Sequence, residues 1–414
     1  MALLLAVVVG LAALSPSRPF QPWPPAGGFA GPTVGGPAGP SGALAGSSAG
    51  PDGSSPSGPG APAAASGGPV TLLLGGDLLL DLAVGRTLAA EGAARTFAGW
   101  LDLRERWGPA LGFANLESPV SDVGEALSGK RYTFRAEPPA APALREGGFE
   151  VVSLANNHAL DFGTEALLDT LARLSAAGVT AVGAGADAGE AYAPRIVRAG
   201  GADLAFLAFT DTFAVPVAHR EMWGAGADRP GTALLTERAR VLEAVAAARG
   251  SGADIVVVSV HWGYEYVRRP APAERALARD IIDAGADLVV GHHPHVTQGL
   301  EVYRGRLILY SLGNLLFDSE KSPDRAVAAL VTFVRDPAGT WAPGECRLRA
   351  MTMDRRSLTP CPAGDAGARA LLEEVADLSR ALGTRVRLEG DELVVEGLAS
   401  PGSEPPEEAE VGGR

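Results

Sequence analysis

Histidines are few in this chain and lie mostly in short motifs at the ends of apolar runs. The sequence holds six histidines, and five of them lie in such motifs: His158, His261, His292, His293 and His295. A lone histidine is more often a hydrogen-bonded core or surface residue than a ligand. Five at the ends of predicted strands are hard to explain in that way, because perturbed titratable groups gather at functional sites. The group therefore predicts a functional site, and only His219 lies elsewhere.

Three further apolar runs end in oxygen-bearing side chains. They begin at Val70, Leu111 and Phe149, and they end near Asp77, Glu117 and Asn157. Taken alone, Asp77 could equally be a turn residue that caps the next helix. Carboxylate, amide and imidazole groups from separate strand ends suit a dinuclear site for Mn, Fe or Zn ions, in which a shared carboxylate holds both cations. No thiolate belongs to the set, which disfavours a structural zinc site.

The two runs that lead to the later histidines have the character of buried parallel strands. Val256–His261 and Asp287–His292 are short and rich in valine, which is typical of strands covered on both faces. Between them, Ala273–Ala284 has helical spacing and stops before Gly285. Strand, helix and strand form a β-α-β unit, and ligands bind at the carboxyl ends of its strands. We therefore expect these histidines at one edge of a parallel sheet.

The first 69 residues are not expected to belong to the folded domain. Residues 1–15 carry a continuous apolar run of about signal-peptide length, which predicts export with the leader either cleaved or kept as a membrane anchor. Residues 16–69 are almost wholly Pro, Gly, Ala and Ser, and such a composition cannot bury enough apolar surface to become ordered. We expect a flexible tether there and an extracytoplasmic protein that is membrane-anchored or secreted.

Composition also bears on the binding partners, the cysteines and the C-terminal part of the chain. A formal net charge of -13 argues against nucleic-acid binding. Cys346 and Cys361 lie outside every motif, so a disulfide and two free thiols both fit the sequence. Residues 336–400 predict a small α+β appendage with a helix over Ala366–Leu382 and a hairpin that turns at Gly390–Asp391. Residues 401–414 predict a disordered acidic tail.

Six motifs together resemble the CapA family of bacterial capsule-synthesis, poly-γ-glutamate-associated proteins. They occur in the family's order: Gly75–Asp77, Asn115–Glu117, Leu154–Gly163, His261–Tyr266, Gly291–His295 and Tyr310–Asn314. The most specific are Asn-Asn-His-x-x-Asp-x-Gly and Gly-x-His-Pro-His. The resemblance implies one metallophosphatase domain over residues 70–335. Its α/β fold would be a calcineurin-like metallophosphoesterase sandwich, with two sheets flanked by helices and metals at the strand ends.

The resemblance also implies a ligand set for two divalent metal ions. Its members are Asp77, Glu117, Asn157, His261, His293 and His295. Glu117 would bridge the metals, with Asp77 and His295 on the first metal and the other residues on the second. His292 occupies a position that varies in the family and stays outside this set. Calcineurin-like phosphatases carry Asp-x-His on the first strand, whereas this chain has Leu79, so the first metal would have one ligand fewer.

The same resemblance implies a hydrolytic function. His158 would be the general acid that protonates the leaving group, and Asp161 would hold its ring. Arg135 and Asn314 are candidate contacts for an anionic small-molecule or polymer substrate. The expected function is metal-dependent hydrolysis in capsule or poly-γ-glutamate biosynthesis, with membrane-associated capsule synthesis machinery as a partner. The alternative is a non-catalytic, membrane-tethered accessory protein that binds or guides an anionic capsule polymer.

Overall fold

The computed structural model of the protein describes residues 68–318, 325–336, 338–354 and 357–398. The expected leader and acidic tail, and all but the last two residues of the expected tether, lie outside these ranges. Within the ranges, no helix has the length and apolar character that crossing a membrane requires. The described residues build several sheets with helices beside them, and both sets of elements are needed to position the predicted site.

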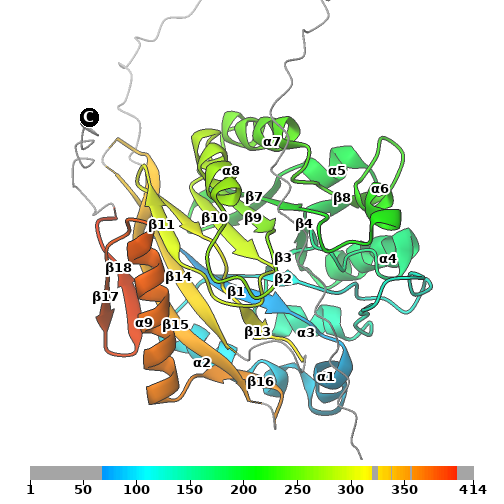
Figure 1. Cartoon of the computed structure of the whole chain (residues 1–414), viewed down its shortest axis with the longest axis horizontal. Coiled ribbons are helices and arrows are strands. Elements are labelled where there is room, and N and C mark those ends of the chain that lie inside the picture. The colour runs from blue at the N-terminus through cyan, green and yellow to red at the C-terminus, as the bar shows by residue number, and fades with distance from the viewer. Residues whose placement is uncertain (1–67, 319–324, 337, 355–356, 399–414) are drawn as a thin grey trace, which may run out of the picture. The chain divides into compact units, whose positions relative to one another are not determined.

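The larger sheet collects strands from both ends of the described chain (Figure 1). Its spatial order is β17-β18-β15-β14-β1-β2-β3-β4, with β13 paired to β1 and β16 paired to β15. Strands β1 to β4 run parallel, and β14 is antiparallel to β1. The strands are β1 (Val70–Leu78), β2 (Leu111–Leu116), β3 (Val151–Ser153), β4 (Thr180–Val182), β13 (Asn314–Leu316), β14 (Arg325–Arg335), β15 (Trp341–Asp354), β16 (Thr359–Pro362), β17 (Val386–Glu389) and β18 (Glu392–Val395).

The second sheet contains the predicted β-α-β unit. Its order is β11-β12-β10-β9-β7-β6. The strands are β6 (Arg195–Ala199), β7 (Ala202–Thr210), β9 (Ile255–His261), β10 (Leu288–His292), β11 (Leu300–Tyr303) and β12 (Arg306–Leu309). The prediction is confirmed, because β9 and β10 are parallel neighbours and α8 (Pro272–Asp283) connects them. Two short strands, β5 (Ala184–Gly185) and β8 (Gly231–Thr232), pair separately.

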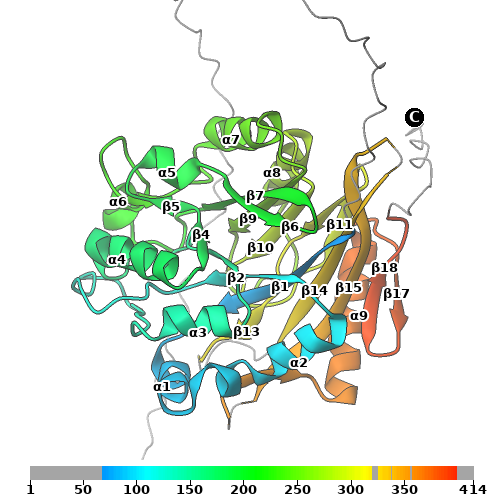
Figure 2. The ribbon, with the colours of Figure 1, turned by 180° about the vertical axis from the view of Figure 1, so that it is seen from behind.

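Helices cover the outer sides of the two sheets (Figures 1 and 2). Those on the larger sheet are α1 (Leu82–Thr96), α2 (Ala98–Trp107), α3 (Ala140–Glu146) and α4 (Gly163–Ala176). Those on the second sheet are α5 (Ala188–Tyr192), α7 (Arg238–Gly250) and α8. The others are the short η1 (Val217–His219) and α6 (Arg220–Trp223), and α9 (Asp365–Ala381), which packs against the core between the sheets. The fold is therefore mixed α/β, with several sheets flanked by helices.

Successive residues of a buried strand point to opposite faces, and this alternation divides the core into layers. Val257 belongs to the core between the sheets, whereas Val256 belongs to the core beneath the helices. His261 has the same parity along β9 as Val257. His292 has the same parity along β10 as Val290, which also lies in the inner core. The period of the two strands therefore directs both histidines toward the facing sheet.

The segment expected to be an appendage continues the larger sheet. Strand β15 pairs with β14 along its length, from Arg325 opposite Thr352 to Arg335 opposite Trp341. The boundary expected at residue 336 falls in the connection between these two strands. Strand β18 pairs with β15, and the hairpin turn predicted between β17 and β18 is confirmed. The C-terminal strands thus lengthen the sheet that carries β1.

A close backbone approach fixes the end of β1. The amide of Asp77 donates a hydrogen bond to the Gly313 carbonyl oxygen at 3.0 Å. A Cβ atom on Gly76 would lie 1.9 Å from the same oxygen, which is far inside van der Waals contact. Glycine is therefore required at position 76, because only a residue without a side chain lets the backbone before Asp77 approach so closely.

Gly76→Ala should lower the free energy of unfolding by about 3 kcal/mol, because the added methyl group displaces either β1 or the Gly313 turn. Gly250→Ala is the matched control, since a Cβ there meets no atom within 4 Å. Its effect should stay within about 1 kcal/mol. Chemical denaturation of both variants tests this, and equal losses of stability would contradict the close approach at Gly76.

Candidate metal centre

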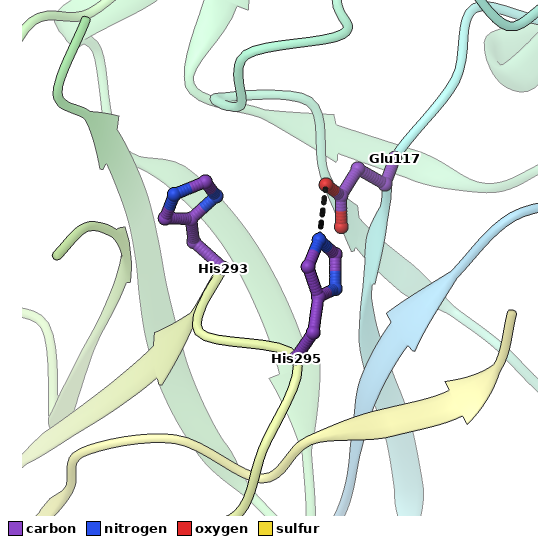
Figure 3. Close-up of side chains that lie close together, drawn as sticks. All are labelled: Glu117, His293 and His295. Atoms are coloured by element: carbon purple, nitrogen blue, oxygen red, sulfur yellow. Dashed lines mark ion pairs between the residues drawn. The ribbon is translucent and has the colours of Figure 1, made fainter. Parts of the chain in front are cut away.

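The structure brings the six implied ligand residues together at one edge of the sheets. They lie at or after the ends of β1, β2, β3, β9 and β10, and each is at most 5% exposed: Asp77, Glu117, Asn157, His261, His293 and His295. Figure 3 shows the Glu117 carboxylate beside His295, with His293 on the same loop. Residues from both sheets therefore meet where the strand-end motifs predicted a site.

Two buried carboxylates share one amide group. Asn115 Nδ2 donates to Asp77 Oδ1 at 2.9 Å and to Glu117 Oε2 at 3.3 Å. Burial raises the pKa of Glu117 well above its usual range, and the negative charge of Asp77 adds to the effect. Burial also acts to raise the pKa of Asp77, but His292 and His295 outweigh it and the net shift is downward. Without a nearby cation, the pair therefore resists carrying two negative charges.

His261 connects the second sheet to this acidic pair. Its Nε2 lies 2.8 Å from Asn157 Oδ1 and 3.8 Å from Glu117 Oε1. The rings of His261 and His293 are 4.7 Å apart between centroids. Burial, followed by repulsion from neighbouring histidines, holds the pKa of His261 well below its usual value, and burial lowers the pKa of His293 to about 3. Both rings are therefore neutral near pH 7 and keep a lone pair that can bind a metal ion.

His295 contacts both carboxylates and one amide. Its Nε2 lies 3.8 Å from Glu117 Oε1, and its Nδ1 lies 3.6 Å from Asp77 Oδ2. Nδ1 is also 2.9 Å from Asn314 Oδ1. The two oxygens near Nδ1, Asp77 Oδ2 and Asn314 Oδ1, can only accept hydrogen bonds. We therefore assign the ring proton to Nδ1, which leaves the Nε2 lone pair facing Glu117. Asn314, expected to contact substrate, is thus hydrogen-bonded to an implied metal ligand.

Two groups of three side chains are arranged closely enough to hold a cation. One is Glu117, His293 and His295, and the other is Asp77, Glu117 and His261; within each group the ligand atoms lie within 4.8 Å of one another. Glu117 belongs to both groups, which is what a carboxylate shared between two cations requires. Its Oε1 and the Nδ1 of His293 are buried without a hydrogen-bond partner among the described residues. Each such atom destabilises a fold by about 1–3 kcal/mol, and a cation would satisfy both, so the residues fit a metal centre.

His158 follows Asn157 and is held by Asp161. Its Nδ1 lies 2.6 Å from Asp161 Oδ2, which also accepts a hydrogen bond from the Phe134 amide at 2.8 Å. Burial lowers the pKa of His158, and the negative charge of Asp161 opposes that shift. No hydrogen bond to a described residue occupies Nε2 of His158. The structure thus brings the two residues together and leaves Nε2 as the nitrogen available for proton transfer.

Sequence reasoning overlooked Lys130, whose side chain is only 5% exposed. Its ammonium group contacts Asp161 Oδ1, and Nζ lies 3.2 Å from His158 Nδ1. Burial lowers the pKa of Lys130, and the charge of Asp161 opposes the shift. One signal was present: lysine occurs only at positions 130 and 321, although Lys and Arg together number 35.

Asp211 is a second residue that the candidate site did not include. Its Oδ1 accepts from the Phe213 amide at 3.0 Å and its Oδ2 from the Gly263 amide at 2.9 Å. Burial raises the pKa of Asp211 to about 7. The side chain ties together the loops that follow β7 and β9, and so supports the position of His261. The strand-end pattern that singled out Asp77 also applies to Asp211 and could have found it.

Arg135 directs its guanidinium to the protein itself. Nη1 donates to the carbonyl oxygens of Val123 and Gly124 at 3.2 and 3.3 Å. The guanidinium also lies 4.1 Å from the ring centroid of Phe162. These contacts hold the loop that follows β2 in place, so the expected substrate contact would have to use the remaining donors of the group.

Two histidines outside the implied ligand set differ in their surroundings. His292 is buried, with Nδ1 3.4 Å from Asp77 Oδ1, and neither ring nitrogen has a hydrogen-bond partner among the described residues. It therefore borders the metal centre on the side of Asp77. His219 belongs to neither group of three ligand residues, and its Nε2 is 2.8 Å from the Ser128 carbonyl oxygen.

Metal binding should depend on the buried histidines and not on His219. We expect Mn²⁺ or Zn²⁺ to raise the Tm of the full chain, since an ion at 100 times its Kd stabilises the folded state by about 2.7 kcal/mol. His261→Ala or His293→Ala should abolish most of this shift, whereas His219→Ala should keep it. Calorimetry and metal analysis after dialysis measure both effects, and equal metal loss in all three variants would refute the assignment.

Several known proteins that resemble this chain carry names from capsule or polyglutamine synthesis. The family description of the bacterial capsule synthesis protein PGA_cap matches residues 71–319. A probable polyglutamine synthesis accessory protein of Mycobacterium tuberculosis (strain ATCC 25618 / H37Rv) is 36% identical over 289 residues, covering 61% of this chain and 75% of the relative. The capsule biosynthesis protein CapA of Bacillus anthracis is 37% identical over 226 residues, 54% of each chain. The PGA biosynthesis protein CapA of Bacillus subtilis (strain 168) is 34% identical over 250 residues, 60% of this chain and 62% of the relative.

Among solved structures, the sulfate thiohydrolase SoxB of Thermus thermophilus aligns with a TM-score of 0.39 and 17% identity, over 70% of this chain and 47% of that chain. A match at that level does not establish a shared fold. The family match, by contrast, covers more than half of the chain, including Asp77 and the motifs that contain His158, His261 and His295. The chain therefore belongs to the family of bacterial capsule synthesis proteins described by PGA_cap, the CapA family.

Proposed function

We propose that this protein is a metal-dependent hydrolase of the phosphoesterase type that acts in capsule or poly-γ-glutamate biosynthesis. The observation that carries the proposal is the position of Glu117, which belongs to both groups of three ligand residues and keeps one buried oxygen unpaired. The His158–Asp161 pair directly follows the ligand residue Asn157 in the chain. A calcineurin-like metallophosphoesterase sandwich is the fold we propose for the two sheets and their helices.

The proposed centre would hold two divalent ions of Mn, Fe or Zn. In the division that the resemblance implies, Glu117 would be shared between them, with Asp77 and His295 on one side and His261 and His293 on the other. The two close groups in the structure pair these residues differently, Asp77 with His261 and His293 with His295. Asn157 would complete the second set through the oxygen that now lies 2.8 Å from His261 Nε2. Leu79 is buried and offers no ligand atom, so the first set is smaller. When bound, such ions supply Lewis acidity and lower the pKa of a coordinated water.

His158 supplies the proton in the proposed mechanism. As an imidazolium it would transfer the Nε2 proton to the oxygen of the leaving group, and its Nδ1–H would stay bonded to Asp161. The 2.6 Å contact between Nδ1 and Asp161 Oδ2 keeps the ring in one orientation during this transfer. Burial lowers the pKa of His158, which makes the imidazolium a stronger acid, and the negative charge of Asp161 opposes that shift.

Substrate and location are part of the proposal. The substrate would be an anionic small molecule or polymer, and membrane-associated capsule synthesis machinery would be the partner. Residues 1–15 would export the chain or anchor it, and residues 16–69 would tether the catalytic domain outside the cytoplasm. Arg268 and Arg269 flank the site in sequence, and Arg268 is engaged in an ion pair with Glu374 at 2.5 Å.

The second candidate function is that of a non-catalytic accessory protein with the same fold and the same site residues. The name of the Mycobacterium tuberculosis relative describes an accessory protein, which favours a role in binding or guiding an anionic capsule polymer. The small first ligand set, with Leu79 in place of a histidine, favours the same role. The His158–Asp161 pair favours catalysis, because a polymer-binding protein has little use for a proton donor next to a metal centre.

His158→Ala should abolish hydrolysis while metal remains bound. With Mn²⁺ and diphenyl phosphate, whose basic phenolate leaving group needs a proton, we expect kcat to fall by a factor of about 10² to 10⁴, the usual contribution of a general acid. Metal content should match that of the wild type, because the side chain is not in the proposed ligand set. His219→Ala is the control and should keep full activity.

The two candidate functions predict different results for the wild-type protein. Metal retained after dialysis together with Mn²⁺-dependent turnover supports the hydrolase. A purified full chain that holds no metal and hydrolyses no ester would overturn it and leave the accessory role.

A further inference from the structure

Lys130 is a buried cation that the proposed mechanism does not yet use. It lies in the connection between β2 and α3, and its side chain is 5% exposed. Nζ donates to the carbonyl oxygen of Asn157 and contacts Asp161 Oδ1. Burying an ammonium group is unfavourable unless charged or polar partners compensate it, so these contacts are needed for the side chain to remain there.

The contacts divide the Asp161 carboxylate between two neighbours. Oδ1 faces the Lys130 ammonium, while Oδ2 accepts from His158 Nδ1 and from the Phe134 amide. Nζ also lies 3.2 Å from His158 Nδ1. Because that nitrogen is only 2.6 Å from an anionic oxygen, we assign its proton to the bond with Asp161. The ammonium then donates to two oxygens, and no described residue forms a hydrogen bond with Nε2 of the imidazole.

We infer that Lys130 is a positioning residue that holds Asp161 and the His158 backbone segment so that Nε2 of His158 serves as the proton donor. This inference rests on the proposed hydrolase function. Lys130 acts through two restraints: one on the carboxylate that orients the imidazole, and one on the Asn157 carbonyl immediately before His158 in the chain. It touches no proposed reacting atom.

The choice of lysine supports a specific role. Arginine serves as the cation almost everywhere else in this chain, because 33 of its 35 basic residues are Arg. A guanidinium is larger and planar, whereas an ammonium is a compact point charge with donors that can reach several acceptors. Nζ also lies 5.0 Å from the ring centroid of Trp223, whose Nε1 donates to the Asn156 carbonyl oxygen at 2.9 Å. Aromatic and backbone groups therefore surround Nζ on the side of His158.

The test uses Lys130→Met, which keeps a side chain of similar length and removes the charge. Arg131→Met is the matched control, because it removes one positive charge from the next residue, which is exposed and contacts the Tyr132 ring. If Lys130→Met yields too little folded protein, Lys130→Gln takes its place. Metal content and Tm are measured for every variant.

The kinetic measurement compares two phosphodiesters with different leaving groups, bis(p-nitrophenyl) phosphate and diphenyl phosphate, in the presence of Mn²⁺. Phenolate is the more basic leaving group and depends more on proton donation. We expect Lys130→Met to lower kcat for diphenyl phosphate by a factor of about 10 to 100, and for the nitrophenyl ester by less than about threefold. Arg131→Met should change neither. Equal losses on both esters, or no loss on either, would overturn the inference.

A second readout does not depend on turnover. In full chain labelled with ¹⁵N-histidine, His158 should give a protonated Nδ1 signal, which is assigned by its absence in His158→Ala. The signal should shift or vanish in Lys130→Met and persist in Arg131→Met. A signal unchanged in Lys130→Met would overturn the inference. If the wild type hydrolyses neither ester, the hydrolase proposal fails by itself, and this spectrum alone decides whether Lys130 positions His158.

Discussion

The buried carboxylate of Glu117 is the constraint on which this structure depends. It is fully enclosed, one of its oxygens has no hydrogen-bond partner among the described residues, and a second carboxylate shares its amide donor. An arrangement of this kind is unfavourable in a dry interior unless a cation compensates the charge. The neutral histidines around it supply lone pairs instead of positive charge. The residues around Glu117 therefore fit a metal ion better than a conventional salt bridge.

The two sheets are the means by which this constraint is met. Parallel strands end at the same edge, and a residue of the right parity at such an end faces the opposite sheet. His261 reaches the acidic pair in this way from β9. Asp77 lies near the end of β1, where only a glycine at position 76 permits the close approach to the turn at Gly313. The C-terminal strands extend the sheet of β1 and so add to the rigid support of that turn.

A second group of charges stands beside the metal centre and is organised differently. His158, Asp161 and Lys130 come from loops, and their hydrogen bonds fix them to one another rather than to a strand. The proposed metal ligands would need only neutral lone pairs and shared oxygens, whereas the proposed proton donor would need one defined tautomer. A carboxylate with each oxygen committed to a different neighbour provides that definition.

Sequence patterns alone predicted the five strands whose ends carry the candidate residues, the helix between β9 and β10, and the identity of the residues at those ends, because continuous apolar runs and terminal glycines are local signals. Only the tertiary structure decided that residues 341–395 lengthen the larger sheet and that Arg135 holds a loop. It also decided that Lys130 meets His158, although these residues lie 28 positions apart. Lys130 belongs to a connection without periodic burial, so its spacing carries no information about direction. Contacts of that kind arise only when two separate segments pack together and bury the charge.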